Sequence, residues 1–260
     1  MILEQLRRDG SATVHALARS IHASLSTIRR DLELLTEQGY LERTRGGALL
    51  MPQFQATFER EPHLNAHFQR RQKIAIGRVA ALRLKHRESV ILDSSSTVME
   101  AVRVAVGRDI AITAVTNGLD IAQLCASSPG WRVIMPGGTI RPGTRLTVGD
   151  PGETFLRSVH ADVCLIGAYS VSGALLTDAS LEVATVKRMM IGAARRKILL
   201  VDSSKFQPPA FCTFAQLSDI DEVITDSEIR KEHLDALRAN GVEVTVVPMD
   251  DVAEVPAPDA

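Results

Sequence analysis

The sequence contains few cysteines and no long apolar run, and both absences narrow the class of protein. Three cysteines among 260 residues cannot all pair, and their spacing fits no metal-binding motif. Cys164 lies in an apolar, strand-like run and is expected to be a small core residue. No apolar stretch approaches the roughly 18–20 residues needed to cross a bilayer, and the start of the chain lacks the features of a secretory signal. We therefore expect a protein of the reducing cytoplasm with no membrane partner.

Nucleotide-binding and metal-binding motifs are also missing. Neither a Walker loop nor a dinucleotide glycine fingerprint follows a predicted strand. His63 and His67 have the spacing of neighbours on a helix, but no third ligand is evident, so solvated histidines are favoured over a metal site. The sequence thus predicts no metal and no cofactor. Its composition, 45% hydrophobic and 23% charged, is that of a soluble globular protein with room for one small and one medium domain.

Charge is distributed unevenly along the chain, although the net charge is only −1. Residues 1–90 contain 15 lysines and arginines against 9 aspartates and glutamates, whereas residues 91–260 contain 15 against 22. A basic end on an acidic body suits a polyanion that is bound at one end. Ordinary variation between two solvated surfaces is the alternative interpretation.

Residues 1–50 show the pattern of three short helices followed by a hairpin. The apolar residues recur at helical spacing in three groups, Ile2, Leu3 and Leu6, then Val14, Leu17, Ala18 and Ile21, then Leu25, Ile28, Leu32 and Leu35. Ser24 is the expected N-cap of the third helix and Gly39 its expected end. A hairpin is predicted between Tyr40 and Met51. Because the chain starts inside the first helix, a few N-terminal residues of such a module are expected to be missing.

After a predicted linker at 51–68, which contains two prolines, strands and helices alternate. Short apolar, β-branched runs occur at 89–93, 110–115, 132–135, 163–167, 197–202, 222–225 and 243–247. Helical patterns occur around Ile74, Ile76, Val79, Ala80 and Leu82 and at 97–106, 119–126, 181–194 and 228–240. This alternation predicts an α/β domain over 69–249, Rossmann-like, with a mostly parallel sheet covered on both faces. The acidic, proline-containing end at 250–260 is expected to be disordered.

The third helix is the expected DNA-reading element. If its apolar stripe faces the core, hydroxyl and guanidinium groups are left exposed at its start, where arginine can bind guanine and hydroxyls can bind phosphates. The candidate DNA contacts are Ser24, Ser26, Thr27, Arg29 and Arg30, in a helix-turn-helix from about Ala12 to Asp31, with Arg43 and Arg45 on the hairpin as a wing. A three-helix protein-interaction module with a solvated basic face is the alternative.

These residues also carry a specific resemblance. The run Thr27-Ile28-Arg29-Arg30-Asp31-Leu32 and the later Arg45-Gly46-Gly47-Ala48 resemble the DeoR family of bacterial repressors, whose signature is this recognition helix followed by a glycine-paired wing. The resemblance extends in the family's order through Lys73, Asp93, Thr116-Asn117, Gly137-Gly138, Lys187-Arg188 and Asp202-Ser203-Ser204-Lys205-Phe206. It implies an all-α winged helix-turn-helix that binds double-stranded operator DNA, joined to a domain that senses a small molecule.

The sensor site is expected beyond the carboxyl ends of the parallel strands. Ser94–Thr97 forms a hydroxyl-rich turn before a helix, which could hold an anion or could simply cap that helix. Arg141 or Lys205 could neutralise a phosphate or could be surface charges. The candidate effector-binding residues are Asp93, Ser94, Ser95, Ser96, Thr97, Thr116, Asn117, Gly138, Arg141, Lys187, Asp202 and Lys205.

The resemblance further implies a domain related to ribose-5-phosphate isomerase and glucosamine-6-phosphate deaminase, with a phosphorylated sugar as the usual effector. The family's first loop usually reads Asp-Ser-Gly-Thr-Thr, and here Ser95 replaces the glycine and Ser96 a threonine. A Cβ at Ser95 is expected to limit how closely the backbone approaches phosphate. The segment Gly167–Gly173 also departs from the family's glycine-rich pattern, so the sugar end of the site is expected to differ.

An enzyme is the alternative to a regulator. Sugar-phosphate isomerisation needs a general base, and the related isomerases supply carboxylates just after the fourth strand. This chain has Ala168–Val171 at that place, and Asp178, Glu182 and Asp202 are the nearest carboxylates. We therefore expect no catalytic residue and a repressor of a sugar or carbohydrate catabolic operon. A homodimer or homotetramer is expected, since symmetric half-sites require a symmetric protein.

Overall fold

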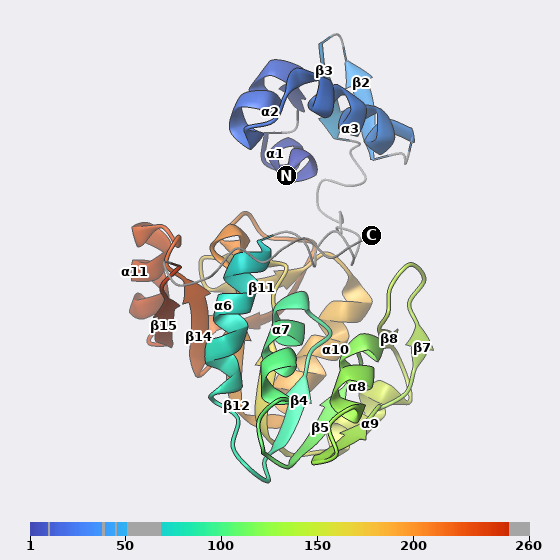
Figure 1. Ribbon diagram of the computed structural model, residues 1–260, viewed down its shortest axis with the longest axis vertical. Helices are drawn as coiled ribbons and strands as arrows, with labels where there is room; N and C mark the ends of the chain where they lie inside the picture. Colours follow the sequence, from blue (N-terminus) through green and yellow to red (C-terminus); the bar gives the residue numbers. More distant parts are fainter. Residues whose placement is uncertain (10, 38–39, 45, 51–68, 250–260) are drawn as a thin grey trace. The chain divides into compact units, whose positions relative to one another are not determined.

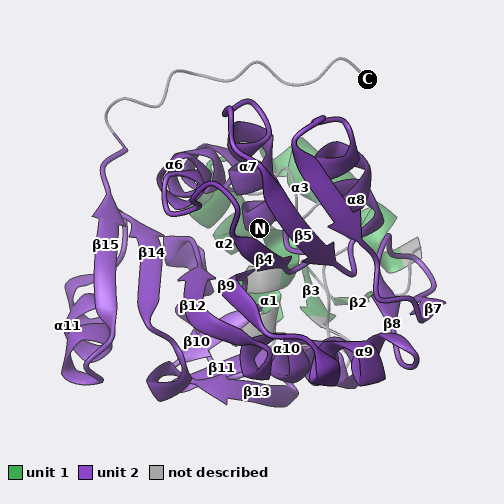
Figure 2. Cartoon of the chain, turned by 90° about the horizontal axis from the view of Figure 1, so that it is seen from below, with its two compact units in different colours: residues 1–59 green, residues 60–260 purple. Residues whose placement is uncertain are grey.

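The computed structural model describes residues 1–9, 11–37, 40–44, 46–50 and 69–249, and the chain divides into two compact units, Met1–Glu59 and Arg60–Ala260 (Figures 1 and 2). Several predictions fall on residues outside the described ones, namely the helix end at Gly39, the wing residue Arg45, the linker at 51–68 with His63 and His67, and the tail at 250–260. Among the described residues, no helix is both long and apolar enough to span a membrane.

The first unit contains three helices and a small antiparallel sheet. In chain order its elements are α1 (Ile2–Asp9), β1 (Ser11–Thr13), α2 (Val14–Ile21), α3 (Leu25–Glu37), β2 (Leu41–Thr44) and β3 (Gly47–Leu50). The sheet has the order β1-β3-β2, and Leu6, Leu17 and Leu32 are fully buried between it and the helices. The predicted helices and hairpin are confirmed. Strand β1 was not predicted, because three residues are too few to show an alternating pattern.

Side-chain caps and one close backbone approach define this unit locally. Thr13 Oγ1 accepts a hydrogen bond from the Ala16 amide at 3.1 Å, and Ser24 Oγ accepts one from the Thr27 amide at 3.1 Å, so α2 and α3 both begin with a side-chain N-cap. Strands β3 and β1 lie so close that a Cβ on Gly47 would be 2.2 Å from the Ala12 carbonyl oxygen. Only glycine fits at that point of the wing.

The second unit is built on a seven-stranded, fully parallel sheet of order β15-β14-β12-β9-β4-β5-β6 (Figure 2). Its strands are β4 (Ser89–Leu92), β5 (Ile112–Thr116), β6 (Trp131–Ile134), β9 (Ala161–Ile166), β12 (Ala194–Leu200), β14 (Glu222–Asp226) and β15 (Glu243–Val247). All seven predicted strands occur, with ends shifted by a few residues. Cys164 is fully buried in β9, as expected.

Two hydrophobic clusters cover the two faces of this sheet. The helices on one face are α6 (Arg70–Ala81), α7 (Ser96–Ala105) and α8 (Leu119–Ala126); on the other lie α9 (Gly152–Ser158), α10 (Leu181–Gly192), α11 (Lys231–Ala239) and an antiparallel sheet of β10 (Ser170–Ser172), β11 (Leu175–Asp178) and β13 (Cys212–Gln216) (Figure 1). Along β4, Val90 and Leu92 enter the first cluster and Ile91 the second. The Rossmann-like class is confirmed.

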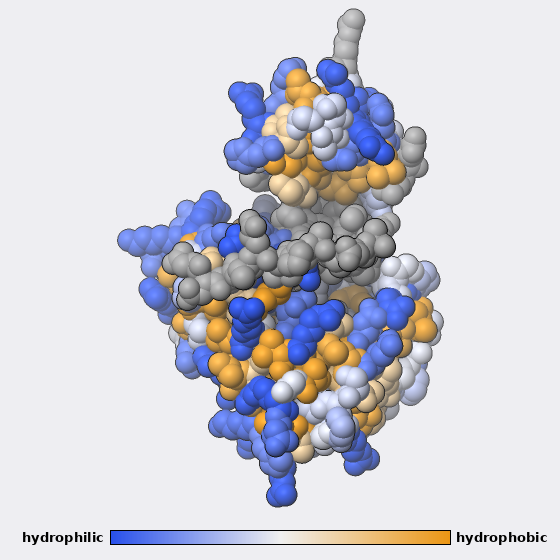
Figure 3. Space-filling view, in the orientation of Figure 1, coloured by the Kyte–Doolittle hydropathy of each residue, from blue (hydrophilic) through white to orange (hydrophobic). Residues whose placement is uncertain are grey.

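Other features of this unit differ from the prediction. Helix α6 ends at Ala81, so Leu82, which the predicted helix included, lies just beyond it at 65% exposure. Figure 3 shows hydrophobic surface over α6 and α7 on the visible face. Helix α11 begins at Lys231, because the preceding residues form the turn that follows β14. The antiparallel sheet, α9 and a hairpin of β7 (Thr139–Ile140) and β8 (Thr147–Val148) were not predicted.

Strand order identifies the centre of the sheet as the point where the chain reverses direction. From β4 the chain moves outward to β5 and β6, then returns to place β9 on the other side of β4. Ligands of open α/β sheets bind in the crevice beyond the carboxyl ends of the strands at such a switch point. The ends of β4 and β9 are therefore where the sensor site should lie.

Candidate DNA interface and effector site

Helix α3 has one buried and one exposed face. Ile28 and Leu32 belong to the apolar core of the first unit. All five predicted contacts of this helix are exposed, namely Ser24, Ser26, Thr27, Arg29 and Arg30. The hydroxyls form a cluster at the start of the helix, because Ser24 Oγ lies 2.8 Å from both Ser26 Oγ and Thr27 Oγ1. Hydroxyls and guanidinium groups are thus brought together at the exposed end of α3.

The wing is anchored to the start of α2. Gly46, at the hairpin tip, has a φ of +93° that favours glycine, and its carbonyl accepts a hydrogen bond from the Val14 amide at 2.9 Å. Arg43 is exposed on β2. The unit therefore presents guanidinium groups from a helix and from a hairpin on a scaffold that fixes both.

The loop between β4 and α7 keeps hydrogen-bond donors available. Ser95 is the N-cap of α7, and its Oγ accepts a hydrogen bond from the Val98 amide at 3.3 Å. Within the described part of the chain, the amides of Ser96 and Thr97 donate no hydrogen bond. Ser95 thus caps the helix, while the next two residues leave amides at its positive end, where an anion is favoured.

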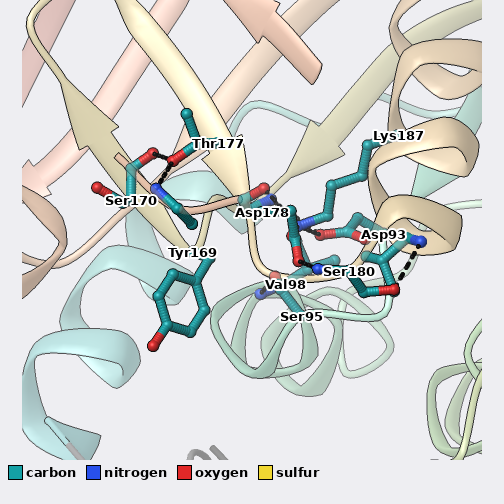
Figure 4. Close-up of polar contacts among 12 residues, drawn as sticks. Asp93, Ser95, Val98, Tyr169, Ser170, Thr177, Asp178, Ser180 and Lys187 are labelled. Atoms are coloured by element: carbon teal, nitrogen blue, oxygen red, sulfur yellow. Dashed lines mark hydrogen bonds and ion pairs between the residues drawn. The ribbon is translucent and has the colours of Figure 1, made fainter. Parts of the chain in front are cut away.

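Beside this loop lies a buried cluster of three charged side chains (Figure 4). Lys187 Nζ lies 2.8 Å from Asp178 Oδ2 and 3.7 Å from Asp93 Oδ2, and it donates a hydrogen bond to the Gly167 carbonyl at 3.0 Å. Asp93 Oδ2 accepts a hydrogen bond from the Gly167 amide at 3.0 Å. Burial raises the pKa of Asp93, and the neighbouring Lys187 opposes that rise. Asp93 and Lys187 therefore point at each other and at the end of β9.

The loops after β4 and β9 are in direct contact. A Cβ on Gly167 would lie 2.7 Å from Ser95 Cβ, so glycine is required at 167. The Cβ of Ser95, at the position where the family usually has glycine, is therefore accommodated against a glycine of the neighbouring loop.

Beyond β5, Thr116 and Asn117 are buried beside the same loop. Thr116 Oγ1 accepts a hydrogen bond from the Gly118 amide at 3.1 Å, and a Cβ on Gly118 would lie 3.1 Å from Ser94 Cβ. Asn117 Nδ2 donates to the Thr147 carbonyl at 3.0 Å. Asn117 Oδ1 is buried and has no hydrogen-bond partner among the described residues. A buried amide oxygen of this kind requires a donor.

Gly138 and Arg141 follow β6 and lie near the β7–β8 hairpin. Gly138 has a φ of +114°, and a Cβ there would lie 2.5 Å from the Val148 carbonyl oxygen. A hydrogen bond from Ser180 lowers the pKa of Glu182, and the charge of Arg141 contributes to the same shift. The charge of Arg141 thus acts on the start of α10, where Ser180 and Glu182 lie.

After β12, Asp202 and Lys205 occupy the same edge of the sheet. Asp202 Oδ1 accepts hydrogen bonds from the amide and hydroxyl of Ser204, whereas its Oδ2 is fully buried without a partner among the described residues. Lys205 Nζ lies 5.7 Å from the centre of the Tyr169 ring. At the end of β14, Asp226 Oδ2 accepts a hydrogen bond from the Ser203 amide at 2.7 Å, and burial raises the pKa of Asp226.

Family models match both units of the chain. The DeoR-like helix-turn-helix domain matches residues 1–54, and the DeoR C terminal sensor domain matches residues 68–227. The chain belongs to the DeoR family. The resemblance of its sequence is thereby confirmed, and the chain is a DNA-binding regulator of transcription.

Curated relatives of this DeoR-family regulator are similar over nearly its whole length. The HTH-type transcriptional repressor GlcR of Bacillus subtilis (strain 168) is 33% identical, covering 96% of this chain and 95% of the relative. The putative aga operon transcriptional repressor of Escherichia coli O157:H7 is 32% identical (95% and 91%). The lactose phosphotransferase system repressor of Lactococcus lactis subsp. lactis is 28% identical (90% and 92%).

Among solved structures, ribose 5-phosphate isomerase A of Methanocaldococcus jannaschii shares 16% identity with this DeoR-family regulator. The similarity has a TM-score of 0.40 and covers 52% of this chain and 53% of that one. A likeness of this size has no bearing on function.

Asp178, Gly167 and Tyr169 are among the residues of this region that sequence reasoning did not assign to the site. Asp178 lies on β11, in the antiparallel sheet that was not predicted, so its approach to Lys187 could not be inferred from spacing. The one available signal is the need of a buried lysine for a carboxylate partner.

Proposed function

We propose that this DeoR-family regulator represses a carbohydrate catabolic operon and that a phosphorylated sugar changes its affinity for the operator. The proposed DNA binding rests on one observation. Hydroxyls and arginines form an exposed cluster at the start of α3, opposite the buried face with Ile28 and Leu32. In this proposal Arg29 and Arg30 contact bases or phosphates in the major groove, the hydroxyls contact phosphates, and Arg43 and Arg45 contact the backbone from the wing.

The effector half rests on the mixture of donors and acceptors at the switch point. The amides of Ser96 and Thr97 suit an anion, and Lys205 adds a point charge. Asn117 Oδ1 and Asp202 Oδ2 are buried acceptors that need donors from elsewhere. A phosphorylated sugar supplies both, an anion at one end and hydroxyl donors along its length. The names of the aga operon and lactose phosphotransferase repressors agree with a carbohydrate-linked role.

The remaining predicted residues support the site from below in this proposal. Asp93 and Lys187 hold the end of β9 through Gly167, and Gly138 allows the close approach of β8. The geometry favours a regulator without catalysis, since Asp93 and Asp178 both lie against Lys187 and are buried, so neither can act as an accessible base.

Regulation in this proposal is allosteric and takes place in the cytoplasm. The effector must bind the DNA-competent and DNA-incompetent states with different affinities, because equal binding shifts no equilibrium. A homodimer or homotetramer would place two recognition helices on symmetric half-sites.

The test uses the full chain and a DNA fragment that it selects from a random library. Affinity for this fragment is measured by fluorescence anisotropy with and without each member of a panel of pentose and hexose phosphates. One phosphate should change the affinity about 5- to 150-fold, while the matching unphosphorylated sugar should not. The same panel, assayed for isomerisation and deamination, should show no turnover. A response to no sugar phosphate, or turnover that follows the purified protein, contradicts the proposal.

Lys205→Ala sharpens this test. Removing the lysine eliminates one charge-assisted hydrogen bond, about 1.5–3 kcal/mol or roughly ten- to a hundredfold in effector affinity, while operator binding is retained. Lys85→Ala is the matched control, since Lys85 is exposed before β4, at the opposite edge of the sheet. If both variants respond like the parent, Lys205 is a surface charge.

A further inference from the structure

Tyr169 brings an aromatic ring to the effector edge of the sheet. It lies three residues beyond the end of β9, in the Gly167–Gly173 segment that departs from the family's glycine-rich pattern. The centre of its ring is 5.7 Å from Lys205 Nζ, within the distance at which the negative face of an aromatic ring attracts an ammonium group. Two residues that are distant in sequence are thus coupled at this edge.

The backbone of Tyr169 is fixed on both sides. Its amide donates a hydrogen bond to the Thr177 carbonyl at 3.2 Å, and its carbonyl accepts one from Gln207 Nε2 at 3.2 Å. Thr177 also contacts Ser170, the residue after Tyr169, because its Oγ1 donates a hydrogen bond to the Ser170 carbonyl at 3.3 Å (Figure 4). Tyr169 therefore projects from a stretch of chain whose backbone is hydrogen-bonded to β11 and to Gln207.

The loop that carries Lys205 is attached to the same stretch. Ser170 Oγ is within hydrogen-bond distance of the Gln207 carbonyl, at 2.8 Å, and of the Pro208 carbonyl, at 2.9 Å. Val171 forms an isolated bridge with Phe206, which directly follows the lysine. These links lie on the C-terminal side of Lys205 and hold the two backbones together, so the ring and the ammonium group are kept in register.

The position of β9 in the sheet places Tyr169 and Lys205 near the proposed effector site. In the sheet β9 lies between β12, which leads to Lys205, and β4, which leads to Ser94–Thr97. Gly167, two residues before Tyr169, already touches Ser95. The strand that leads to Tyr169 thus lies between the strand that leads to the cation and the strand that leads to the amide donors.

We propose that Tyr169 is a positioning residue of the effector site, holding the Lys205 ammonium group at the crevice between β9 and β4 for the anionic group of the effector. A lysine whose side chain is already held loses less conformational freedom when an anion binds than a freely moving one. The proposal rests on the proposed function, because it assumes an anion at the amides of Ser96 and Thr97.

The test measures binding of inorganic phosphate to the full chain at constant ionic strength, by thermal shift and calorimetry. Tyr169→Phe retains the ring and should bind phosphate like the parent. Tyr169→Leu should weaken binding about three- to tenfold, and Lys205→Ala by at least as much. The double variant should bind no more weakly than Lys205→Ala alone, because the ring acts through the lysine. Operator binding without phosphate should stay unchanged in all variants.

A shape-preserving variant covers the case in which Tyr169→Leu does not fold. Trifluorinated phenylalanine at position 169 keeps the ring but removes the negative charge of its face. It should weaken phosphate binding relative to Tyr169→Phe, and the difference should vanish when Lys205→Ala is added.

Each other outcome overturns a defined part of the proposal. Additive effects of Tyr169→Leu and Lys205→Ala, or equal losses in Tyr169→Leu and Tyr169→Phe, exclude positioning of the lysine by the ring. A loss in Lys205→Ala with none in Tyr169→Leu overturns the role of Tyr169 and leaves the proposed effector site intact. If phosphate does not bind the parent, the effector site itself is wrong, and the role of Tyr169 is wrong with it. Lys85→Ala controls for the loss of one positive charge.

Discussion

The two units of this regulator differ in whether their charged side chains are exposed or buried. Among the described residues of the winged-helix unit, the buried side chains are apolar, and Arg29, Arg30 and Arg43 are exposed. In the α/β unit, Asp93 and Lys187 are almost completely buried, at 1% and 5% exposure, and other carboxylates are buried with them. Three of these carboxylates, Asp93, Asp202 and Asp226, lie at or just after the carboxyl ends of parallel strands, where the effector site is proposed.

This contrast has consequences for how each unit can change. An exposed arginine contributes little free energy to folding, because it stays in contact with water in both states. A DNA-reading surface can therefore be altered without affecting stability. A buried ion must be compensated by a partner, and removing one partner costs several kcal/mol. The sensor site is therefore constrained by the folding of its own unit, whereas the DNA-reading surface is not.

The largest effect is expected at Lys187. Lys187→Met leaves Asp93 and Asp178 buried without their cation and should lower the free energy of unfolding of the α/β unit by about 3–5 kcal/mol. Urea unfolding followed by the fluorescence of Trp131, the single tryptophan, measures this unit. Arg195→Ala removes the exposed pair with Asp162 and should cost at most about 1 kcal/mol. Equal losses in the two variants would contradict the contrast between buried and exposed charge.

A cavity is expected to be the main vulnerability of the winged-helix unit. Leu17→Ala removes a fully buried side chain between α2 and α3 and should destabilise this unit by about 2–5 kcal/mol. Because the described core of this unit has no titratable group, the loss should be the same at pH 5 and pH 8. Hydrogen exchange of the α2 and α3 amides measures it, with Leu34→Ala, at 53% exposure, as the nearly neutral control. If the stability loss of Leu17→Ala depended strongly on pH, the contrast between an apolar core in this unit and buried charges in the α/β unit would be wrong.

The exposed arginines should matter for DNA and not for folding. Arg29→Ala and Arg30→Ala should each lower the free energy of operator binding by about 1–3 kcal/mol if they contact a base, or reduce the salt dependence if they contact phosphate. Neither should change stability by more than about 0.5 kcal/mol. Anisotropy titrations at several salt concentrations check this, with the exposed Arg78→Ala of α6 as control. Parent-like binding by both folded variants would remove them from the interface.

The same contrast explains how much of the structure could be predicted from the sequence. Apolar periodicity identified α1, α2, α3 and all seven parallel strands, because in each the repeat of buried residues follows the helix or strand period. The exposed face of α3 followed directly from the stripe of Ile28 and Leu32 on the other face. Short elements such as β1 and β10 were missed, since three residues carry no period.

Contacts between distant segments could not be predicted in the same way. Nothing near Lys187 in sequence identifies Asp178 on β11 as its partner, nor Tyr169 as the neighbour of Lys205. Both contacts depend on the antiparallel sheet, which arises from pairing across more than thirty residues, as between Asp178 and Cys212. Sequence reasoning found the edge of the sheet that holds the site, while the arrangement within it required the structure.

The smallest expected effect concerns Asp226, whose pKa burial raises above its ordinary value of 3.8. An acid that keeps its proton to higher pH when folded adds stability below its ordinary pKa, and this stability is lost as the pH rises through the raised pKa. Asp226→Asn has no such proton to lose. The difference in free energy of unfolding, parent minus variant, should therefore fall between pH 4 and pH 7, by at most about 1.4 kcal/mol per pH unit. Asp93 also has a raised pKa, but it is present in both proteins and cancels.

Asp162 offers a control of opposite sign in the same unit. Hydrogen bonds from the amide and hydroxyl of Ser89 lower its pKa, so its contribution is present above the ordinary pKa and is lost as the pH falls. Parent minus Asp162→Asn should therefore rise with pH only below about pH 4 and stay flat between pH 4 and pH 7, where parent minus Asp226→Asn falls. Urea unfolding followed by Trp131 fluorescence at pH values from about 2 to 7 measures both. If parent minus Asp162→Asn also falls between pH 4 and pH 7, the buried and the part-buried carboxylate do not behave differently in this unit, and the comparison fails at its most direct point.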